Sequence, residues 1–288
     1  MRIVGEAWHT IRLCIAGITG RMGGALAEEA VSQGFEIVGT IAGSGEPSIG
    51  KTLKEAGICN LAVSIVDSSN LEEAAKDADV YVSFATPTAE LVNLPTVAKI
   101  GKRIVMGTTG FSDEQMENLK QVVGARVPAV FSPNYSLGVN VIFKLVKTLA
   151  LLPSEYDFSV AELHHTGKKD APSGTALKLG ELISEARGYR TVVHGRQGIS
   201  PRKPHELEVL SLRAGGVAGI HDLVIAGPHE MIRIEHLAFS RSVFAQGALV
   251  ASEWINGIDA PGIYGMDDVL GERASMSMDR GGNAGVKE

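Results

Sequence analysis

The chain has 288 residues, 44% of them hydrophobic and 21% charged, which suffices for one large or two smaller globular cores. Its 27 basic and 33 acidic side chains give a formal net charge of −6, which argues against a nucleic-acid partner. No apolar stretch approaches a membrane span, the N-terminus carries no signal-like apolar core, and the two cysteines form neither a disulfide framework nor a metal-ligand spacing. We therefore expect a cytoplasmic protein with no membrane partner and no metal.

Local patterns in the first half of the chain alternate between strand and helix. An apolar run at 11–16 predicts a strand, and a helical pattern at 21–33 follows it. The alternation continues with strands at 35–41, 80–85, 103–106 and 127–131 and with helices at 88–100 and 112–123. Strands that alternate with helices form a parallel sheet covered on both faces, so a Rossmann-like, doubly wound α/β domain is predicted.

The pattern changes near Pro133 and predicts a second, smaller domain. A helix at 139–152, a strand at 158–163 and a helix around 177–186 come first. Closely spaced strands then follow at 207–212, 222–226 and 232–239, with glycine-containing turns between them. Short antiparallel strands combined with helices predict an α+β domain. A last helix is expected at 242–255, and the polar, glycine-rich tail from residue 271 is predicted to be disordered.

A glycine-rich turn joins the first predicted strand to the first predicted helix. Gly17, Gly20 and Gly23 have the spacing G-x-x-G-x-x-G, a variant of the dinucleotide-binding pattern. Backbone N–H groups at a helix start can hold a pyrophosphate when no Cβ atom intervenes. An ordinary glycine-rich turn explains the spacing equally well, but its place at the first strand–helix junction favours a cofactor loop.

Two later loops, at residues 84–87 and 107–111, also follow strands of the predicted parallel sheet. Glycine, threonine and proline are common in turns, so neither loop is informative alone. Ligands of open α/β sheets bind at the carboxyl ends of the strands. Three polar, glycine-rich loops at that edge together favour a binding site.

The most specific segment extends from Glu162 to Thr175 and joins a predicted strand to a predicted helix. Two imidazoles and two ammonium groups lie within residues 164–169. In an acidic protein, such a cluster beside a helix start that favours a carboxylate predicts a site for an anionic small molecule. Histidine can donate or accept a proton near neutral pH, and lysine can donate one. A solvated charged loop is the alternative, and the clustering argues against it.

Basic residues of the later predicted strands are further candidates for this pocket: Arg213, His221, His229, Arg233 and His236. Because alternate side chains of a strand point to opposite faces, many of them are expected to face solvent. Only Arg213 is kept as a substrate-binding candidate.

The segment 162–175 resembles the hallmark E-x-H-H-x-x-K-x-D-A-P-S-G-T of the dihydrodipicolinate reductases. The resemblance extends from about residue 11 to residue 270, through the turn 17–23, the loop 107–111, the segment 132–140, Leu212-Arg213-Ala-Gly215 and Ser240-Arg241. It implies a dinucleotide-binding domain formed by residues 1–134 and 241–288, to which the C-terminal helix returns. It also implies a substrate-binding domain, residues 135–240, whose sheet builds a homotetramer.

The resemblance implies an activity as well. Members of this family use NADPH or NADH to reduce a cyclic dicarboxylate, 4-hydroxy-tetrahydrodipicolinate, in lysine and diaminopimelate biosynthesis. By resemblance, His164 is a proton donor or acceptor, Lys168 is a proton donor, and His165, Gly174 and Thr175 hold the substrate. The residues implied to contact the cofactor are Gly17, Ile18, Thr19, Gly20, Arg21, Met22, Gly107, Thr108, Thr109, Ser132, Pro133, Asn134 and Tyr135.

The chain departs from the family at the end of the second strand. The family usually carries an acidic residue there, whereas this chain has Gly43, Ser44 and Gly45. Gly43 and Ser44 are the cofactor-binding candidates at this position. An acidic residue would repel the 2′-phosphate of NADPH, so we expect NADPH to be accepted at least as well as NADH.

Two other interpretations are compatible with the first domain. An amino-acid-type Rossmann dehydrogenase would share that domain but has no need of the segment 162–175. A catalytically silent NAD(P)-binding sensor need not keep both His164 and Lys168, and it would bind the cofactor without turnover.

Overall fold

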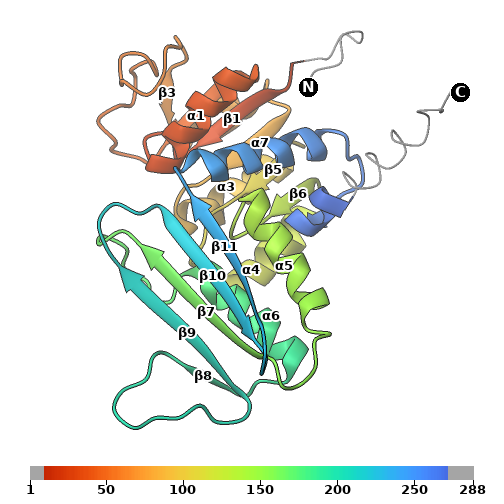
Figure 1. Cartoon of the computed structure of the whole chain (residues 1–288). Coiled ribbons are helices and arrows are strands. Elements are labelled where there is room, and N and C mark those ends of the chain that lie inside the picture. The colour runs from red at the N-terminus through yellow and green to blue at the C-terminus, as the bar shows by residue number, and fades with distance from the viewer. Residues whose placement is uncertain (1–9, 272–288) are drawn as a thin grey trace, which may run out of the picture. The chain divides into compact units, whose positions relative to one another are not determined.

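The structure of the protein is a computed structural model that describes residues 10–271. Residues 1–9 and 272–288 lie outside this range, and with them all but the first residue of the tail from residue 271 for which disorder is predicted. Residue 271 itself is helical, which differs from the prediction. The chain divides into two compact units (Figure 1). The first unit contains the described residues up to Tyr135 and those from Ala245 onward, and the second unit contains Ser136–Phe244.

The first unit is built on a seven-stranded sheet in which all neighbouring strands are parallel. The strand order is β12-β6-β5-β4-β1-β2-β3. The strands are β1 (Arg12–Ala16), β2 (Glu36–Ala42), β3 (Ile65–Asp67), β4 (Val80–Ser83), β5 (Arg103–Met106), β6 (Pro128–Phe131) and β12 (Gly262–Tyr264). The predicted doubly wound α/β domain is confirmed.

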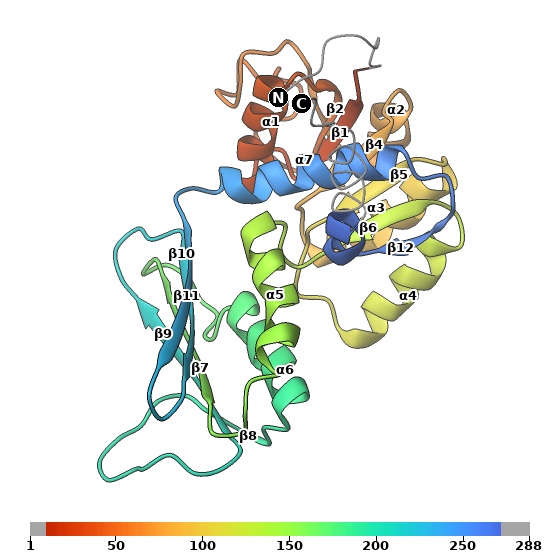
Figure 2. The same ribbon diagram turned by 45° about the vertical axis from the view of Figure 1, so that its right-hand side comes forward.

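Helices cover both faces of this sheet (Figures 1 and 2). One face carries α2 (Leu71–Ala75), α3 (Pro87–Lys99) and α4 (Asp113–Gly124), and the other carries α1 (Arg21–Gln33) and α7 (Ser242–Asn256). Alternate residues of each strand therefore enter different cores.

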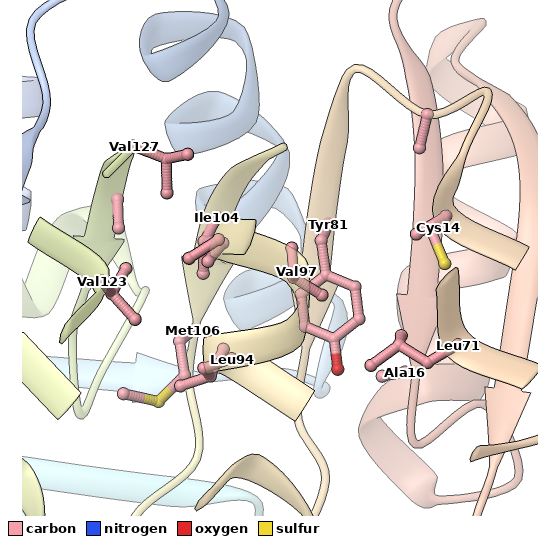
Figure 3. Close-up of a cluster of buried hydrophobic side chains, with 14 of the residues drawn as sticks. Cys14, Ala16, Leu71, Tyr81, Leu94, Val97, Ile104, Met106, Val123 and Val127 are labelled. Atoms are coloured by element: carbon pink, nitrogen blue, oxygen red, sulfur yellow. The ribbon is translucent and has the colours of Figure 1, made fainter. Parts of the chain in front are cut away.

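A core of buried apolar side chains lies between the sheet and the helices α2, α3 and α4 (Figure 3). Cys14 and Ala16 of β1 lie in it together with Tyr81 of β4 and Leu94 of α3. The intervening residues of the strands are equally buried on the opposite face. Because both faces are covered, the strands appear in the sequence as continuous apolar runs without polar alternation.

The strand order reverses at β1, which has β2 on one side and β4 on the other. Open α/β sheets bind ligands at the carboxyl ends of the strands next to such a reversal. The turns after β1 and β4 are in close contact there, since a Cβ atom on Gly17 would lie 3.0 Å from the Phe84 carbonyl oxygen. The fold thus places the predicted cofactor loops at the expected edge.

The second unit contains a five-stranded sheet in the order β11-β10-β7-β9-β8. Its strands are β7 (Asp157–His164), β8 (Thr191–Val193), β9 (Glu206–Arg213), β10 (Gly219–Ala226) and β11 (Met231–Ala238). The prediction of antiparallel strands holds for β10, which is antiparallel to both β7 and β11. It is wrong for β9, which is parallel to β7 and β8. The local pattern of a strand does not specify its partner.

The helices α5 (Leu137–Leu149) and α6 (Gly174–Arg187) cover one face of the second sheet (Figure 2). Their apolar side chains pack against β7, β9 and β10 around Phe158 and Val160. Within the described part of this unit, the opposite face is open to solvent. It carries apolar side chains that are 37% to 63% exposed: Leu210, Leu212, Met231 and Leu237.

Candidate active site

The turn after β1 is shaped by its glycines. Gly17 has a φ of +73°, a left-handed conformation that favours glycine. The N–H groups of Gly17 and Ile18 both donate to the Ile41 carbonyl of β2. A Cβ atom on Gly23 would lie 2.2 Å from the Gly17 carbonyl oxygen. The start of α1 therefore packs directly on the turn, and only glycine allows this approach.

The N-terminus of α1 suits an anion. Its N-cap residue is Gly20, which has no side chain to cap the helix, and its first turn contains no Asp or Glu. The N-termini of α3, α4, α5 and α6 are instead capped by hydroxyl side chains: Thr86, Ser112, Ser136 and Ser173. The first-turn N–H groups of α1 and the positive end of its dipole therefore fit the pyrophosphate of a dinucleotide.

The loops after β4 and β5 are bonded to each other at the same edge. The N–H group of Gly107 donates to the Ser83 carbonyl over 2.9 Å. The Thr108 hydroxyl donates to the Ala85 carbonyl over 3.3 Å, and the Thr108 side chain is consequently buried. Thr109 is exposed. The loops after β1, β4 and β5 thus lie side by side.

The loop after β6 is anchored by Tyr135. Its hydroxyl lies 2.9 Å from the carbonyl oxygens of both Met106 and Val130. Burial raises the pKa of Tyr135 well above that of an ordinary phenol, so the hydroxyl stays protonated. Ser132 is also buried, whereas residues 133–134 are more accessible. The side chains of Ser132 and Tyr135 therefore hold the loop in shape.

An acidic residue of the neighbouring strand, β3, lies beside the residues that follow β2. The exposed Ser44 hydroxyl donates to Asp67 Oδ1 over 3.1 Å. Asp67 ends β3, which is parallel to β2, so both strands end at the same edge. The N–H group of Ser69 also donates to Asp67, and these hydrogen bonds lower the pKa of its carboxyl group. The sequence pattern missed Asp67 because it is 23 residues away from Ser44.

The catalytic candidate His164 lies at the end of β7, on the face of the second sheet that α5 and α6 cover. Glu162, two residues earlier, points to the same face, and its Oε2 atom lies 2.5 Å from His164 Nδ1. Arg213 of the neighbouring β9 donates to both carboxylate oxygens of Glu162, over 2.8 and 2.9 Å. Glu162 is 1% exposed and His164 is 8% exposed.

Two further histidines lie on this face. His221 Nε2 is 3.1 Å from the Ser173 hydroxyl, and His236 Nε2 is 3.0 Å from the Ser136 hydroxyl. Each serine also accepts an N–H group at the start of its helix, α6 for Ser173 and α5 for Ser136. The ring of His221 meets the ring of His164 edge-on at 5.1 Å. Sequence patterning had not distinguished these two histidines from other basic residues.

The segment between β7 and α6 carries the remaining candidates. Lys168 Nζ forms an ion pair with Asp170 over 2.9 Å, and the Lys168 side chain is 20% exposed. His165 is half-buried. Residues 174–175 form the first turn of α6, immediately after the serine that caps it.

The charges of this site follow from burial and hydrogen bonding. Burial opposes ionisation of Glu162, but hydrogen bonds from Arg213 and His164 outweigh it and lower its pKa to about 2. Burial lowers the pKa of His164, despite the opposing effect of Glu162, and lowers that of His221 to about 3. Glu162 is therefore ionised at neutral pH while both imidazoles are neutral. Lys168 is close enough to contribute to the lowered pKa of His164.

Within residues 10–271, no group of three or more His, Cys, Asp or Glu side chains is arranged to hold a metal ion. In the same range, no helix combines the length and apolar character needed to cross a membrane.

Comparison with known families assigns both halves of the chain. Residues 11–135 match the family model for the N-terminus of dihydrodipicolinate reductase, and residues 138–270 match the model for its C-terminus. The chain belongs to the dihydrodipicolinate reductase family. The two matched reductase regions meet at the first boundary between the compact units, and the C-terminal region also includes residues 245–270 of the first unit.

Relatives named 4-hydroxy-tetrahydrodipicolinate reductase are similar over nearly their whole length. The protein of Methanosarcina barkeri is 42% identical over 91% of this chain and 99% of its own. The protein of Archaeoglobus fulgidus is 40% identical over 90% of this chain and all of its own (100%). The segment 162–175 falls in the C-terminal reductase region.

Solved structures support the reductase fold. A dipicolinate-bound dihydrodipicolinate reductase from Paenisporosarcina sp. TG-14 is 22% identical with a TM-score of 0.70, covering 89% of this chain and 98% of that one. An amine dehydrogenase from Mycobacterium smegmatis is 15% identical with a TM-score of 0.63, covering 89% of this chain and 95% of that one.

Proposed function

We propose that the protein reduces 4-hydroxy-tetrahydrodipicolinate to tetrahydrodipicolinate with NADPH or NADH, in lysine and diaminopimelate biosynthesis. The observation that carries this proposal is the end of β7. There, a histidine held by a buried carboxylate, an ion-paired lysine and the N-terminus of a helix lie within one short segment. Family membership supports the same reaction.

The substrate is a small dicarboxylate, which needs positive charge at two places. The N-terminus of α6, at Gly174 and Thr175, offers the positive end of a helix dipole to one carboxylate. His165 and the Lys168 ammonium lie in the segment just before α6 and would bind the second carboxylate of the substrate. A structural neighbour, the Paenisporosarcina reductase, carries dipicolinate, a dicarboxylate of this kind.

Protons are handled by His164 and Lys168 in this proposal. Because Nδ1 of His164 faces the ionised Glu162, its reactive nitrogen is Nε2. Lys168 is a cation that can donate a proton to the reduced substrate, with Asp170 holding the ammonium in place. Arg213 stays a substrate-binding prediction, although both of its terminal nitrogens already donate to Glu162.

The four loops of the first unit fit a nicotinamide dinucleotide. The uncapped start of α1, from Gly17 to Met22, would hold the pyrophosphate, and the approach of Gly23 to Gly17 leaves room for no side chain there. Gly107, Thr108 and Thr109, the segment 132–135, and Gly43 with Ser44 would line the remaining edge of the sheet. Loss of the 4-hydroxyl group of the substrate as water gives a conjugated C=C–C=N system. A bound nicotinamide would supply the hydride that reduces this system, and a proton would complete the reduction.

We also propose that residues 1–134 and 241–288 act as the dinucleotide-binding domain and residues 135–240 as the domain for substrate binding and oligomerisation. The open face of the second sheet, with exposed Leu210, Leu212, Met231 and Leu237, supports a homotetramer. A cytoplasmic location is part of the proposal and agrees with the free cysteines, Cys14 and Cys59.

A coupled assay tests the function. The full chain is mixed with the product of dihydrodipicolinate synthase and NADPH or NADH, and the absorbance of the reduced nicotinamide is followed. We expect the absorbance of the reduced nicotinamide to fall only when both the synthase product and the protein are present. Cofactor binding without turnover would instead identify a sensor, and activity with an amino acid and oxidised cofactor alone would identify another dehydrogenase. Either result contradicts the proposal.

A further inference from the structure

We propose that Glu162 is a positioning residue of this site, which holds His164 and the start of α6 in one fixed arrangement. The inference rests on the proposed function and extends it to a residue that touches neither substrate nor cofactor. Its Oε2 atom accepts from His164 Nδ1 over 2.5 Å. Its Oε1 atom accepts from the N–H group of Ser173, the N-cap residue of α6, over 3.1 Å. One carboxylate thus connects the proton-transferring group with the proposed anchor of the substrate.

The ionised state of Glu162 decides which imidazole nitrogen carries a proton. Its pKa is lowered to about 2, because hydrogen bonds from Arg213 and His164 outweigh the effect of burial. A carboxylate only accepts hydrogen bonds, so His164 must donate from Nδ1. The neutral ring is therefore held as the Nδ1–H tautomer, with its lone pair on Nε2.

A second connection joins the same two parts of the site. The Ser173 hydroxyl contacts His221 Nε2 over 3.1 Å, and the His221 ring packs edge-on against His164. Ser173 is thus bound through its N–H group by Glu162 and through its hydroxyl by His221. Gly219 leaves room for this contact, since a Cβ atom there would lie 3.0 Å from His164 Nε2.

Arg213 fixes the carboxylate itself. Besides its bidentate pair with Glu162, its terminal nitrogens donate to the carbonyls of Leu212 and Asp170 over 2.6 Å each. The Asp170 side chain holds Lys168. The Glu162–Arg213 pair therefore reaches all three elements of the proposed machinery: the imidazole, the ammonium and the helix start.

A buried ion pair that only stabilises the fold would have the same burial but different consequences. The loss of such a pair would lower the free energy of unfolding and leave the kcat of the folded protein and its pH profile unchanged. The loss of a positioning residue lowers kcat and moves the pH profile, and the tautomer that the residue enforces is measurable without turnover.

The first measurement uses the unmodified protein. In the full chain with ¹⁵N-labelled histidine, the nitrogen chemical shifts report the tautomer of each ring, and the spectrum of His164→Asn identifies the His164 signals. We expect His164 to be in the Nδ1–H form at neutral pH. An Nε2–H form, or the mixture of tautomers found in a free imidazole, would overturn the proposal whether or not the protein has the proposed activity.

The second measurement compares two variants of Glu162 with a control variant at another glutamate of the same sheet. Glu162→Gln keeps the shape and removes the charge, and Glu162→Asp keeps the charge. The matched control is Glu208→Gln, since Glu208 of β9 is ion-paired with Arg196 on the face away from the site.

For Glu162→Gln we expect the pKa of His164 to fall, the acidic limb of the kcat–pH profile to move to lower pH, and kcat to fall about 10²-fold, the size of a general acid–base contribution. Glu162→Asp should recover part of all three changes, and Glu208→Gln should cause none of them. If the Gln variant keeps the wild-type tautomer, pKa and kcat, the proposal is wrong. If it does not fold, the tautomer in the unmodified protein and the pKa of His164 in Glu162→Asp still decide.

Discussion

The start of α6 is the residue-scale feature that distinguishes this site from a general dinucleotide-binding protein. Ser173 caps the helix and is held by Glu162 and His221, so the next two residues, Gly174 and Thr175, are presented in a fixed position. A preorganised helix start favours a carboxylate without reorganising on binding.

Thr175→Val tests this assignment, because it keeps the shape of the side chain and removes the hydroxyl. We expect KM for the substrate to rise more than kcat falls, since the contact is made before and during reaction. Steady-state kinetics with saturating cofactor give both constants. Pyridine-2,6-dicarboxylate should compete with the substrate and not with the cofactor. An unchanged KM would place the carboxylates elsewhere.

The individual residues of the site were only partly predictable from sequence. The segment 162–175 contains His164 and Lys168 in a spacing specific enough to find. The inner-face positions of His221 and His236 required the pairing register of β10 and β11, because the sequence did not reveal which alternating set faced the helices. Arg233, one of the same candidates, is exposed and paired with Asp222.

At the scale of elements, the junction of β1 and α1 is the most constrained part of the first unit. Gly23→Ala places a Cβ atom 2.2 Å from a backbone oxygen, so the turn or the helix must move. We expect the free energy of unfolding to fall by about 1–3 kcal/mol and NADPH affinity to fall about tenfold or more, because the anion-binding N–H groups shift. Denaturant unfolding and cofactor fluorescence titration measure the two effects.

The neighbouring glycine is the matched control for that substitution. A Cβ atom on Gly24 would meet only Ile58 Cγ2, at 3.9 Å. Gly24→Ala should therefore leave cofactor affinity unchanged and stabilise α1 by up to about 1 kcal/mol. Equal effects of the two substitutions would show that cofactor affinity does not depend on the close approach of Gly23 to the turn.

Cofactor preference depends on the ends of β2 and β3. Gly43 and Ser44 carry no charge, so we expect kcat/KM for NADPH to be at least that for NADH. A tenfold or larger preference for NADH, about 1.4 kcal/mol, would contradict this expectation. Asp67, held by Ser44, would then be the first acid to examine, and Glu46 the second. The preference should disappear in Asp67→Asn or in Glu46→Gln, according to which carboxylate is responsible.

Strands that are buried on both faces were predictable, whereas the three-residue strands and the short helix α2 were not. β1, β4 and β5 appear as apolar runs ended by glycine or polar turns, because both of their faces are buried. β3, β8 and β12 have three residues each and α2 has five, too few to show a period. β12 exists through its pairing with β6, more than a hundred residues earlier in the chain. Such tertiary pairing is not encoded in a local pattern.

At the scale of the whole molecule, the buried site makes stability depend on pH. Burial lowers the pKa of His221 from 6.5, its ordinary value, to about 3. The stability linked to this difference is fully present above pH 6.5 and is lost as the pH falls toward 3. Glu162, lowered from 4.5 to about 2, acts in the same direction at more acidic pH.

Urea unfolding at pH 7 and pH 5 measures this effect. We expect the free energy of unfolding to fall by about 2 kcal/mol through His221 alone, at about 1.4 kcal/mol for each pH unit below 6.5. His221→Gln should reduce the pH dependence by that amount. If the variant and the unmodified protein show the same dependence between these pH values, His221 does not titrate as its burial requires.

In the proposed reaction, the segment 162–175 supplies the proton for a reduction whose hydride comes from a nicotinamide. The most direct test is kcat and NADPH affinity of Lys168→Met beside Lys178→Met, a lysine of α6 that is also ion-paired but lies outside the site. We expect Lys168→Met to lower kcat by about 10²–10⁴-fold with unchanged NADPH affinity, and Lys178→Met to match the unmodified enzyme. Near-normal turnover of Lys168→Met would rule out the proposed proton donor.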